Sequence, residues 1–141
     1  MSAYFDTSVL LPRLIEEPAS AAIRHYLAAH HQERLISDFA AAEVASAFSR
    51  LVRMGLLANA DASERLAEFD AWRAATSVVA DIGASDARLA YIYVRRFDLR
   101  LRAPDALHIA IVRRLDATLV TLDQRMARAA GELGIAVAVP S

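Results

Sequence analysis

The sequence contains no cysteine and no lysine, and it has only four glycines and four prolines among its 141 residues. The absence of cysteine excludes disulfide bonds, thiol nucleophiles and cysteine-ligated zinc. No apolar run approaches the roughly 18 residues that a membrane-spanning helix needs. The N-terminus also lacks the basic segment and long apolar segment of a signal peptide. We therefore expect a cytoplasmic protein with no membrane partner.

Charge of neither sign dominates, because 16 basic residues stand against 17 acidic ones. A net charge of −1 excludes a basic protein that coats nucleic acid. Every basic residue is arginine, which either the codon usage of a GC-rich genome or a need for planar phosphate-binding groups would explain. Four local pairs stand out: Arg50 with Arg53, Arg95 with Arg96, Arg100 with Arg102, and Arg113 with Arg114. Such pairs would let basic surroundings coexist with an acidic pocket, as a nuclease requires.

The apolar periodicity predicts one domain in which strands and helices alternate. We expect strands at 2–5, 34–37, 77–81, 117–122 and 135–139. We expect helices at 19–30, 38–54, 59–75, 85–97, 104–115 and 124–133, and a further one after Thr7 that breaks at Pro12 or Pro18. Within 85–97 the predicted apolar stripe consists of Ala87, Ala90, Tyr91, Val94 and Phe97. This order implies an α/β fold in which a parallel sheet of about five short strands has helices on both faces. The two long helices around Gly55 predict a helical hairpin.

Four acidic residues lie where four stretches of apolar sequence end. Asp6 follows the first predicted strand, Glu43 lies one turn into the helix after the second, Asp105 opens a helix behind Pro104, and Asp123 follows 117–122. The carboxyl ends of parallel strands meet at one edge of a sheet, where ligands bind. Four carboxylates there would repel one another unless a divalent cation entered. The sequence therefore predicts metal-dependent chemistry on a phosphate ester.

Each acid also has a structural explanation. Asp6 and Asp123 stand at positions where Asp caps helices well, and the dipole of its helix favours an anion at Asp105. Glu43 lies among apolar residues, which is unusual for a charged side chain. The structural explanation for Glu43 is a surface contact with Arg50 on the same helical face. The functional explanation is that its carboxylate points to the edge of the sheet while Arg50 holds substrate phosphate. Asp86 and the other scattered acids are expected to be solvated or to cap helices.

Two hydroxyl residues near the acids join the candidate site, and a nearby histidine does not. Ser8 lies close to Asp6, where its hydroxyl could orient a ligand or water. Thr121 shares a side of its strand with Asp123, and its hydroxyl could hold one of the other carboxylates. His108 follows Asp105 by one turn, but it stands on a mostly apolar helix, where a histidine is more often a packed residue than a ligand. We therefore leave His108 out of the predicted catalytic residues.

The acidic motifs resemble those of the PIN domain, and most closely those of VapC-type toxins of bacterial toxin–antitoxin pairs. They are Tyr4-Phe5-Asp6-Thr7-Ser8, Ala42-Glu43-Val44, Pro104-Asp105-Ala106-Leu107-His108-Ile109-Ala110 and Leu119-Val120-Thr121-Leu122-Asp123-Gln124-Arg125. Their order and spacing cover nearly the whole chain. The resemblance implies a single PIN domain over residues 1–141, a three-layer sandwich from which the helical hairpin protrudes.

The resemblance also implies an activity. In the family the matching acids, here Asp6, Glu43, Asp105 and Asp123, bind Mg²⁺ or Mn²⁺, and the protein is an RNA endonuclease that inhibits growth. Ser8 and Thr121 would be polar support, and Arg50 would bind RNA. The family further implies a homodimer and a VapB-type antitoxin, joined in a heterotetramer or a larger complex. The C-terminal segment of that antitoxin would cover the acidic groove, often with a basic side chain among the carboxylates.

Two other functions stay open from the sequence. One is a catalytically silent PIN-like module that binds RNA or its antitoxin without cutting. The other is a receiver-like signalling module, in which clustered Asp residues bind Mg²⁺ around a phosphorylated Asp. A receiver-like module needs a lysine late in the chain, and this chain has none.

Overall fold

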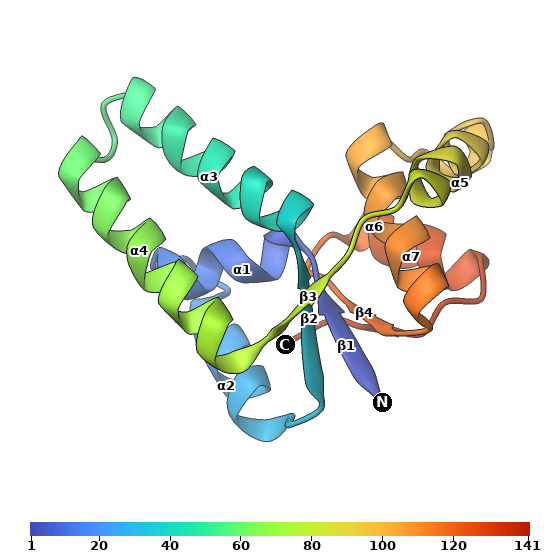
Figure 1. Ribbon diagram of the computed structural model, residues 1–141, viewed down its shortest axis with the longest axis horizontal. Helices are drawn as coiled ribbons and strands as arrows, with labels where there is room; N and C mark the ends of the chain where they lie inside the picture. The colour runs from blue at the N-terminus through green and yellow to red at the C-terminus, as the bar shows by residue number, and fades with distance from the viewer.

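A parallel five-stranded sheet with strand order β3-β2-β1-β4-β5 forms the centre of the computed structural model, which describes residues 1–141 (Figure 1). The strands are short: β1 Ser2–Phe5, β2 Glu33–Ser37, β3 Val78–Ala80, β4 Thr118–Val120 and β5 Val137–Ala138. β1 is the middle strand and pairs in parallel with both β2 and β4. The predicted parallel sheet of about five short strands is confirmed.

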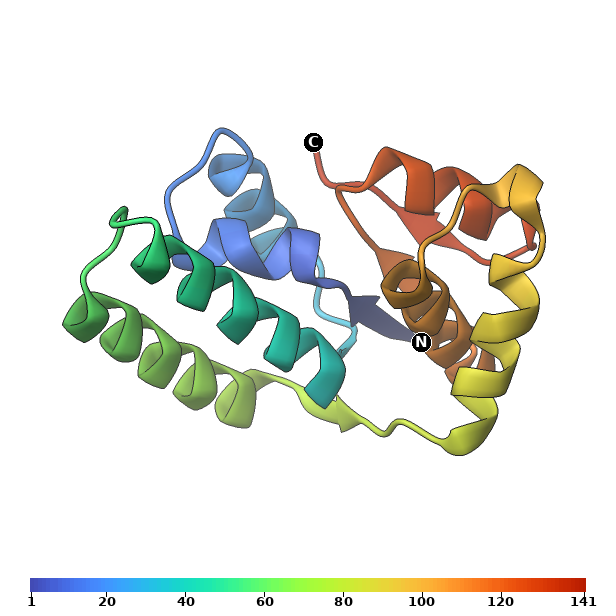
Figure 2. The same ribbon diagram turned by 90° about the horizontal axis from the view of Figure 1, so that it is seen from above.

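Helices cover both faces of this sheet, so the molecule has three layers (Figure 2). One layer consists of α1 Thr7–Leu14, α2 Ser20–Ala29, α3 Asp38–Arg53 and α4 Asn59–Thr76. The other consists of α5 Ala84–Val94, α6 Ala103–Leu115 and α7 Gln124–Glu132, with the 3-10 helix η1 Phe97–Leu99 between α5 and α6. No helix is long and apolar enough to cross a membrane.

The strands divide their side chains between two cores. Tyr4 and Leu119 contribute to a core under α5, α6 and α7, whereas Phe5, Ile36 and Val120 contribute to a second core under α1 to α4. Successive side chains of a strand point to opposite faces of the sheet. By the same alternation Asp6 and Thr121 lie on the face of Tyr4 and Leu119, the face that α6 covers.

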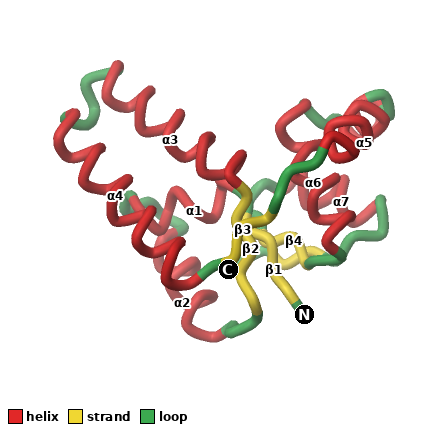
Figure 3. The backbone as a smooth tube through the Cα atoms, viewed as in Figure 1, coloured by secondary structure: helices red, strands yellow, loops and turns green.

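The α3–α4 hairpin extends away from the sheet, as predicted (Figure 3). Ser37 caps α3, because its hydroxyl accepts a hydrogen bond from the Ala40 amide at 3.0 Å. Gly55 follows the helix with a φ of 72°, a conformation that glycine adopts without steric cost. Fully buried Phe48 on α3 and Phe69 on α4 belong to the core that holds the two helices together.

The structure differs from the sequence prediction at α5, which ends at Val94 rather than at Phe97. Phe97 lies in η1 and is 85% exposed, and Tyr91 is also exposed. The buried face of α5 carries Ala90, which the predicted stripe contains, and Tyr93, which it does not. Apolar residues spread around all sides of this helix, so spacing alone could not identify the stripe that packs.

Asp86 caps its helix, one of the two predicted alternatives, but it is also a buried ion-pair partner, which was not predicted. Its carboxylate accepts the Gly83 amide at 2.8 Å and two guanidinium N–H groups of Arg114 at 2.9 and 2.8 Å. The hydrogen bonds from Arg114 hold the pKa of Asp86 below its usual value. The partner is 28 residues away in sequence, and nothing local in the sequence announces it.

We predict that Phe48→Ala lowers the free energy of unfolding by about 3–5 kcal/mol, because it leaves a cavity between α3 and the core. The measurement is urea unfolding, where the midpoint should fall at an unchanged slope. Ser46→Ala, an exposed change on the same helix, should alter stability by less than about 0.5 kcal/mol. A loss below about 1 kcal/mol for Phe48→Ala would show that the hairpin is not packed as described.

Candidate active site

The four predicted acids all lie toward the carboxyl edge of the sheet. Asp6 directly follows β1, and its backbone amide continues the pairing by donating to the Val120 carbonyl at 3.3 Å. Asp123 follows β4, Glu43 lies in α3 directly after β2, and Asp105 lies in the first turn of α6. The topology therefore brings residues from four separate parts of the chain to one edge.

Asp6 is a buried carboxylate, only 2% exposed, that does not cap its helix. One carboxylate oxygen, Oδ1, accepts the Ser8 hydroxyl at 2.6 Å, and the other, Oδ2, accepts the Thr121 hydroxyl at 2.7 Å. Both predicted hydroxyls therefore contact the same acid. The capping explanation for Asp6 fails, since no helix amide uses its side chain.

Asp123, in contrast, caps α7. Its Oδ1 accepts the backbone amides of Arg125 and Met126, each at 3.0 Å. Asp105 has a similar local contact, because its Oδ2 accepts the Arg102 amide at 3.3 Å at the start of α6. The capping explanation for Asp123 is confirmed, and Asp105 lies in the first turn of its helix as predicted. Each contact uses only one of the two carboxylate oxygens. Asp105 is nonetheless buried, at 8% exposure.

Glu43 does not contact Arg50, the partner that its structural explanation required. Its Oε1 accepts the Thr7 hydroxyl at 2.8 Å and lies 2.5 Å from Nε2 of His108. The contact with His108 joins α3 to α6, two helices that cover opposite faces of the sheet. Glu43 therefore spans the carboxyl edge between the two helical layers.

His108 is the residue of this edge that the sequence reasoning missed. It is packed, as predicted, with 2% exposure, but both of its ring nitrogens have polar partners. Nδ1 lies 2.6 Å from the Tyr4 hydroxyl, and Nε2 contacts Glu43. The available signal was its place one turn after Asp105, on the sheet-facing side of α6.

The pKa values of Asp6 and Glu43 are shifted in opposite directions. Burial raises the pKa of Asp6, and the nearby Asp123 raises it further, although the Ser8 and Thr121 hydroxyls oppose the shift. Burial would also raise the pKa of Glu43, but the hydrogen bonds from His108 and the Thr7 hydroxyl, together with the charge of Arg102, outweigh it. The pKa of Glu43 therefore lies below its usual value.

Arg50 lines a groove that reaches Glu43. The groove has a volume of about 730 Å³, and its positive charge comes from Arg50, Arg53 and Arg102. Thr7 and Ser46 add hydroxyls to its lining. An anionic strand lying in this groove would have three guanidinium groups on its path to the acidic edge.

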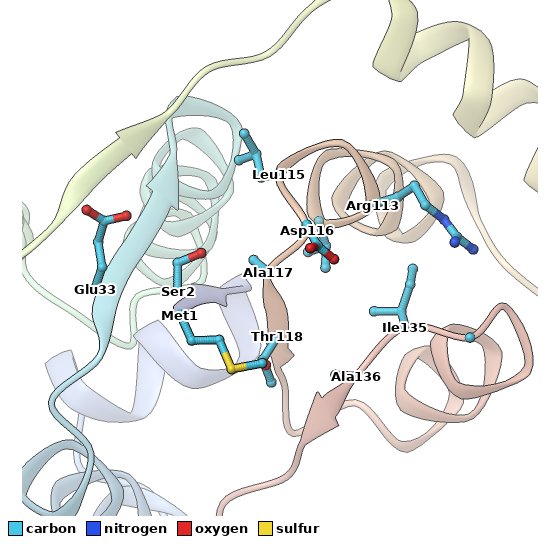
Figure 4. A pocket seen from close by; sticks show the side chains of 12 residues that line it. Met1, Ser2, Glu33, Arg113, Leu115, Asp116, Ala117, Thr118, Ile135 and Ala136 are labelled. Carbon is cyan, nitrogen blue, oxygen red and sulfur yellow. The ribbon is translucent and has the colours of Figure 1, made fainter.

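A second cavity, of about 580 Å³, lies at the other end of the sheet (Figure 4). Met1, Ser2, Glu33, Asp116 and Thr118 surround it, where β1, β2 and β4 begin. It contains none of the predicted site residues. In open α/β sheets ligands bind at the carboxyl ends of the strands, and we therefore place the candidate site at the acidic edge.

The acids provide the oxygen donors that Mg²⁺ prefers, but they do not form a closed cage. No three His, Asp or Glu side chains lie close enough together to hold a metal ion. The hydrogen bonds to Glu43, Asp105 and Asp123 each go to one oxygen, which leaves the other without a protein donor. Mg²⁺ commonly binds one or two carboxylates and keeps several waters. The residues present therefore fit an ion held partly through water.

Comparison with known proteins identifies relatives along almost the whole chain. The family model of the PIN domain matches residues 3–132. The protein named Ribonuclease VapC46, from Mycobacterium tuberculosis, is 34% identical over 141 residues, which covers 98% of this chain and 97% of that protein.

Solved structures share the fold at low sequence identity. VapBC2 from Rickettsia felis, crystallised with a DNA fragment from its promoter, superposes with a TM-score of 0.73 at 15% identity and covers all of both chains. VapC20 from Mycobacterium tuberculosis, described as a toxin that cleaves the sarcin–ricin loop, gives 0.71 at 18% identity and covers 90% of this chain and 94% of that one.

We predict that Asp6→Asn stabilises the metal-free protein at neutral pH. The folded pKa of Asp6 lies above its unfolded value of 3.8, so the folded state binds its proton more tightly. Ionised Asp6 therefore reduces stability above the folded pKa, and this penalty disappears as the pH falls below the unfolded value. Urea unfolding in chelator at pH 7 and near pH 4 should show a gain for Asp6→Asn at pH 7 that fades in acid.

Glu43→Gln provides the matched comparison, because the pKa of Glu43 is shifted in the opposite direction to that of Asp6. The lowered folded pKa of Glu43 means that its charge stabilises the fold above the unfolded pKa, and that this contribution is lost as the pH falls through the folded value. Glu43→Gln should therefore be less stable than the native protein at pH 7. Equal signs for the two variants would contradict this description of the edge.

Proposed function

The chain belongs to the PIN domain family, and on that basis we propose that it is a Mg²⁺-dependent endoribonuclease of the VapC type, which inhibits growth as the toxin of a toxin–antitoxin pair. One observation carries the proposal: buried Asp6 contacts only two hydroxyls and lies close enough to Asp123 for their charges to interact. A cation at this edge would relieve the repulsion between them. The relative named as a ribonuclease supports an RNA substrate.

Each residue of the edge would have a distinct part in cleavage. Mg²⁺ or Mn²⁺, when bound, would lower the pKa of a water and neutralise charge on the phosphate. Asp6 and Asp105 would hold the ion, and Glu43 and Asp123 would complete its shell directly or through water. Ser8 and Thr121 hold both oxygens of Asp6 in one orientation.

Glu43 has a geometry suited to orienting a water. Thr7 and His108 both engage Oε1, so the carboxylate cannot rotate freely, and Oε2 remains to accept a proton from water. The groove beside Glu43 would hold the RNA backbone, with Arg50 as a phosphate contact and Arg53 and Arg102 along the same path.

We also propose the partners that this function needs. A VapB-type antitoxin would cover the acidic edge with its C-terminal segment, and a basic side chain there would replace the charge of the cation and exclude substrate. The neighbour crystallised as VapBC2 supports such a complex. A homodimer that joins antitoxin in a heterotetramer or a larger assembly completes the proposal.

A second candidate function is a catalytically silent PIN-like module that binds RNA or its antitoxin. The lack of three acids already gathered around one point would suit such a module. The two functions differ in whether metal and RNA together give products.

We predict that the purified, antitoxin-free protein cleaves bacterial RNA into discrete fragments with Mg²⁺ or Mn²⁺ and not with chelator. Asp105→Asn should reduce the rate at least about 100-fold, since metal contributes several kcal/mol and each 1.4 kcal/mol is about tenfold. Gel analysis of total RNA, with sequencing of the fragment ends, measures both effects.

Asp61→Asn is the matched control for this experiment. Asp61 occupies the third position of α4, as Asp105 does in α6, but it is exposed and lies outside the edge. The Asp61→Asn variant should cleave RNA at the native rate. Metal binding without fragments from any RNA would favour the silent module, and fragments that persist in chelator or in Asp105→Asn would exclude the proposed mechanism.

We predict that Arg50→Gln weakens RNA binding and lowers its salt dependence. Loss of one phosphate contact to a single strand should reduce the slope of log affinity against log salt by about 0.7. Filter binding in the Asp105→Asn background measures this without cleavage. Arg88→Gln, an exposed change on α5 in the other helical layer, should leave the slope unchanged; equal slopes for both variants would remove Arg50 from the RNA path.

A further inference from the structure

A chain of three hydrogen bonds, with both ends on α3, lies beneath the acidic edge. It starts at Ser37, the cap of α3, passes through Tyr4 on β1 and His108 on α6, and returns to α3 at Glu43. The Ser37 and Tyr4 hydroxyls lie 2.8 Å apart, Tyr4 and Nδ1 of His108 2.6 Å apart, and Nε2 and Glu43 2.5 Å apart. Ser37, Tyr4 and His108 are all buried, so water does not compete for these contacts.

The donors and acceptors of this hydrogen-bond chain can all be assigned in one direction. An ionised carboxylate only accepts, so Nε2 of His108 must carry a proton toward Glu43. In a neutral imidazole Nδ1 then accepts from the Tyr4 hydroxyl, and Tyr4 accepts from the Ser37 hydroxyl. Ser37 in turn accepts the Ala40 amide of α3. The two buried hydroxyls and both imidazole nitrogens are satisfied, which is the condition under which a buried polar network makes a structure rigid.

This chain of hydrogen bonds connects the two helical layers at the point where the acids meet. Glu43 belongs to the α1–α4 layer, whereas Asp105 lies one turn before His108 on α6 in the other layer. The imidazole therefore sets how far the Glu43 carboxylate lies from the N-terminus of α6. Phe39 and Tyr4 pack against the ring of His108, with centroids 5.2 and 5.7 Å away, and restrict its rotation.

We propose that His108 is a positioning residue of the acidic edge: Tyr4 holds its imidazole, and the imidazole holds Glu43 in the orientation that metal and RNA require. This inference rests on the proposed function for what the edge binds. The hydrogen-bond chain exists without metal, so the geometric part of the inference can be tested without any activity.

The first test observes the ring N–H protons of His108 in metal-free protein labelled with ¹⁵N-histidine. A proton in a short hydrogen bond to a carboxylate resonates far downfield. We expect such a resonance on Nε2, and we expect it to move upfield in Glu43→Gln and to shift in Tyr4→Phe. A resonance that is unchanged in Glu43→Gln would overturn the proposal.

The second test measures Mn²⁺ affinity by electron paramagnetic resonance of the free ion. Removal of a residue that orients a metal ligand typically weakens metal binding about 10–100-fold, and we expect that loss for His108→Asn, whose amide reaches Tyr4 but not Glu43. His108→Gln, whose amide nitrogen can take the place of Nε2, should recover most of the affinity. Equal affinities for His108→Asn and the native protein would overturn the proposal, even if the melting temperature falls.

A double-mutant cycle on RNA cleavage separates positioning from packing. If His108 acts through Glu43, His108→Asn should slow the maximal rate in the native background and have no further effect in the Glu43→Gln background. An equal slowing in both backgrounds would show a packing role and contradict the proposal. If the native protein binds no Mn²⁺, the proposed function fails, and the proton resonance still decides whether His108 holds Glu43.

Discussion

The parallel pairing of β1 with strands on both sides determines where everything else in this molecule lies. Phe5 pairs with Val120 and Tyr4 with Leu35 and Leu119, so the register of the middle strand sets the height of every strand end. Because β1 stops at Phe5, Asp6 is carried to the edge and meets Thr121 there. A slip of one residue would turn Asp6 to the opposite face and place Phe5 against α6.

The edge shows how one set of acids can serve both fold and chemistry. Asp105 and Asp123 each give one oxygen to a helix terminus and keep one without a protein donor. Asp6 makes no such contribution, and its burial works against its ionised form. Glu43 differs again, because a histidine from the opposite layer supports its charge. The stability of the fold and the properties of the candidate site are therefore properties of the same carboxylates.

Local sequence patterns were sufficient for the sheet, the helical hairpin and the positions of the acids at strand ends. Period-two alternation correctly placed the Thr121 hydroxyl against a carboxylate, and Pro104 marked the first turn of α6. The patterns failed where a partner lies far away in the chain. Asp86 with Arg114, and Glu43 with His108, are separated by 28 and 65 residues, and each pair is created only by the packing of α6. The prediction that Tyr91 and Phe97 lie on a packed stripe was wrong for another reason, since hydrophobicity does not say which side of a helix will be covered.

The separation of Asp6 and Thr121 by 115 residues has a consequence for how the protein is made. A ribosome releases the chain from its N-terminus, so Asp6 emerges 115 residues before its partner Thr121. A nascent chain that stops short of Thr121 therefore lacks one side of the edge. A nuclease built on this edge would stay incomplete until Thr121 has been added, and an inhibitor made alongside would have that interval in which to accumulate.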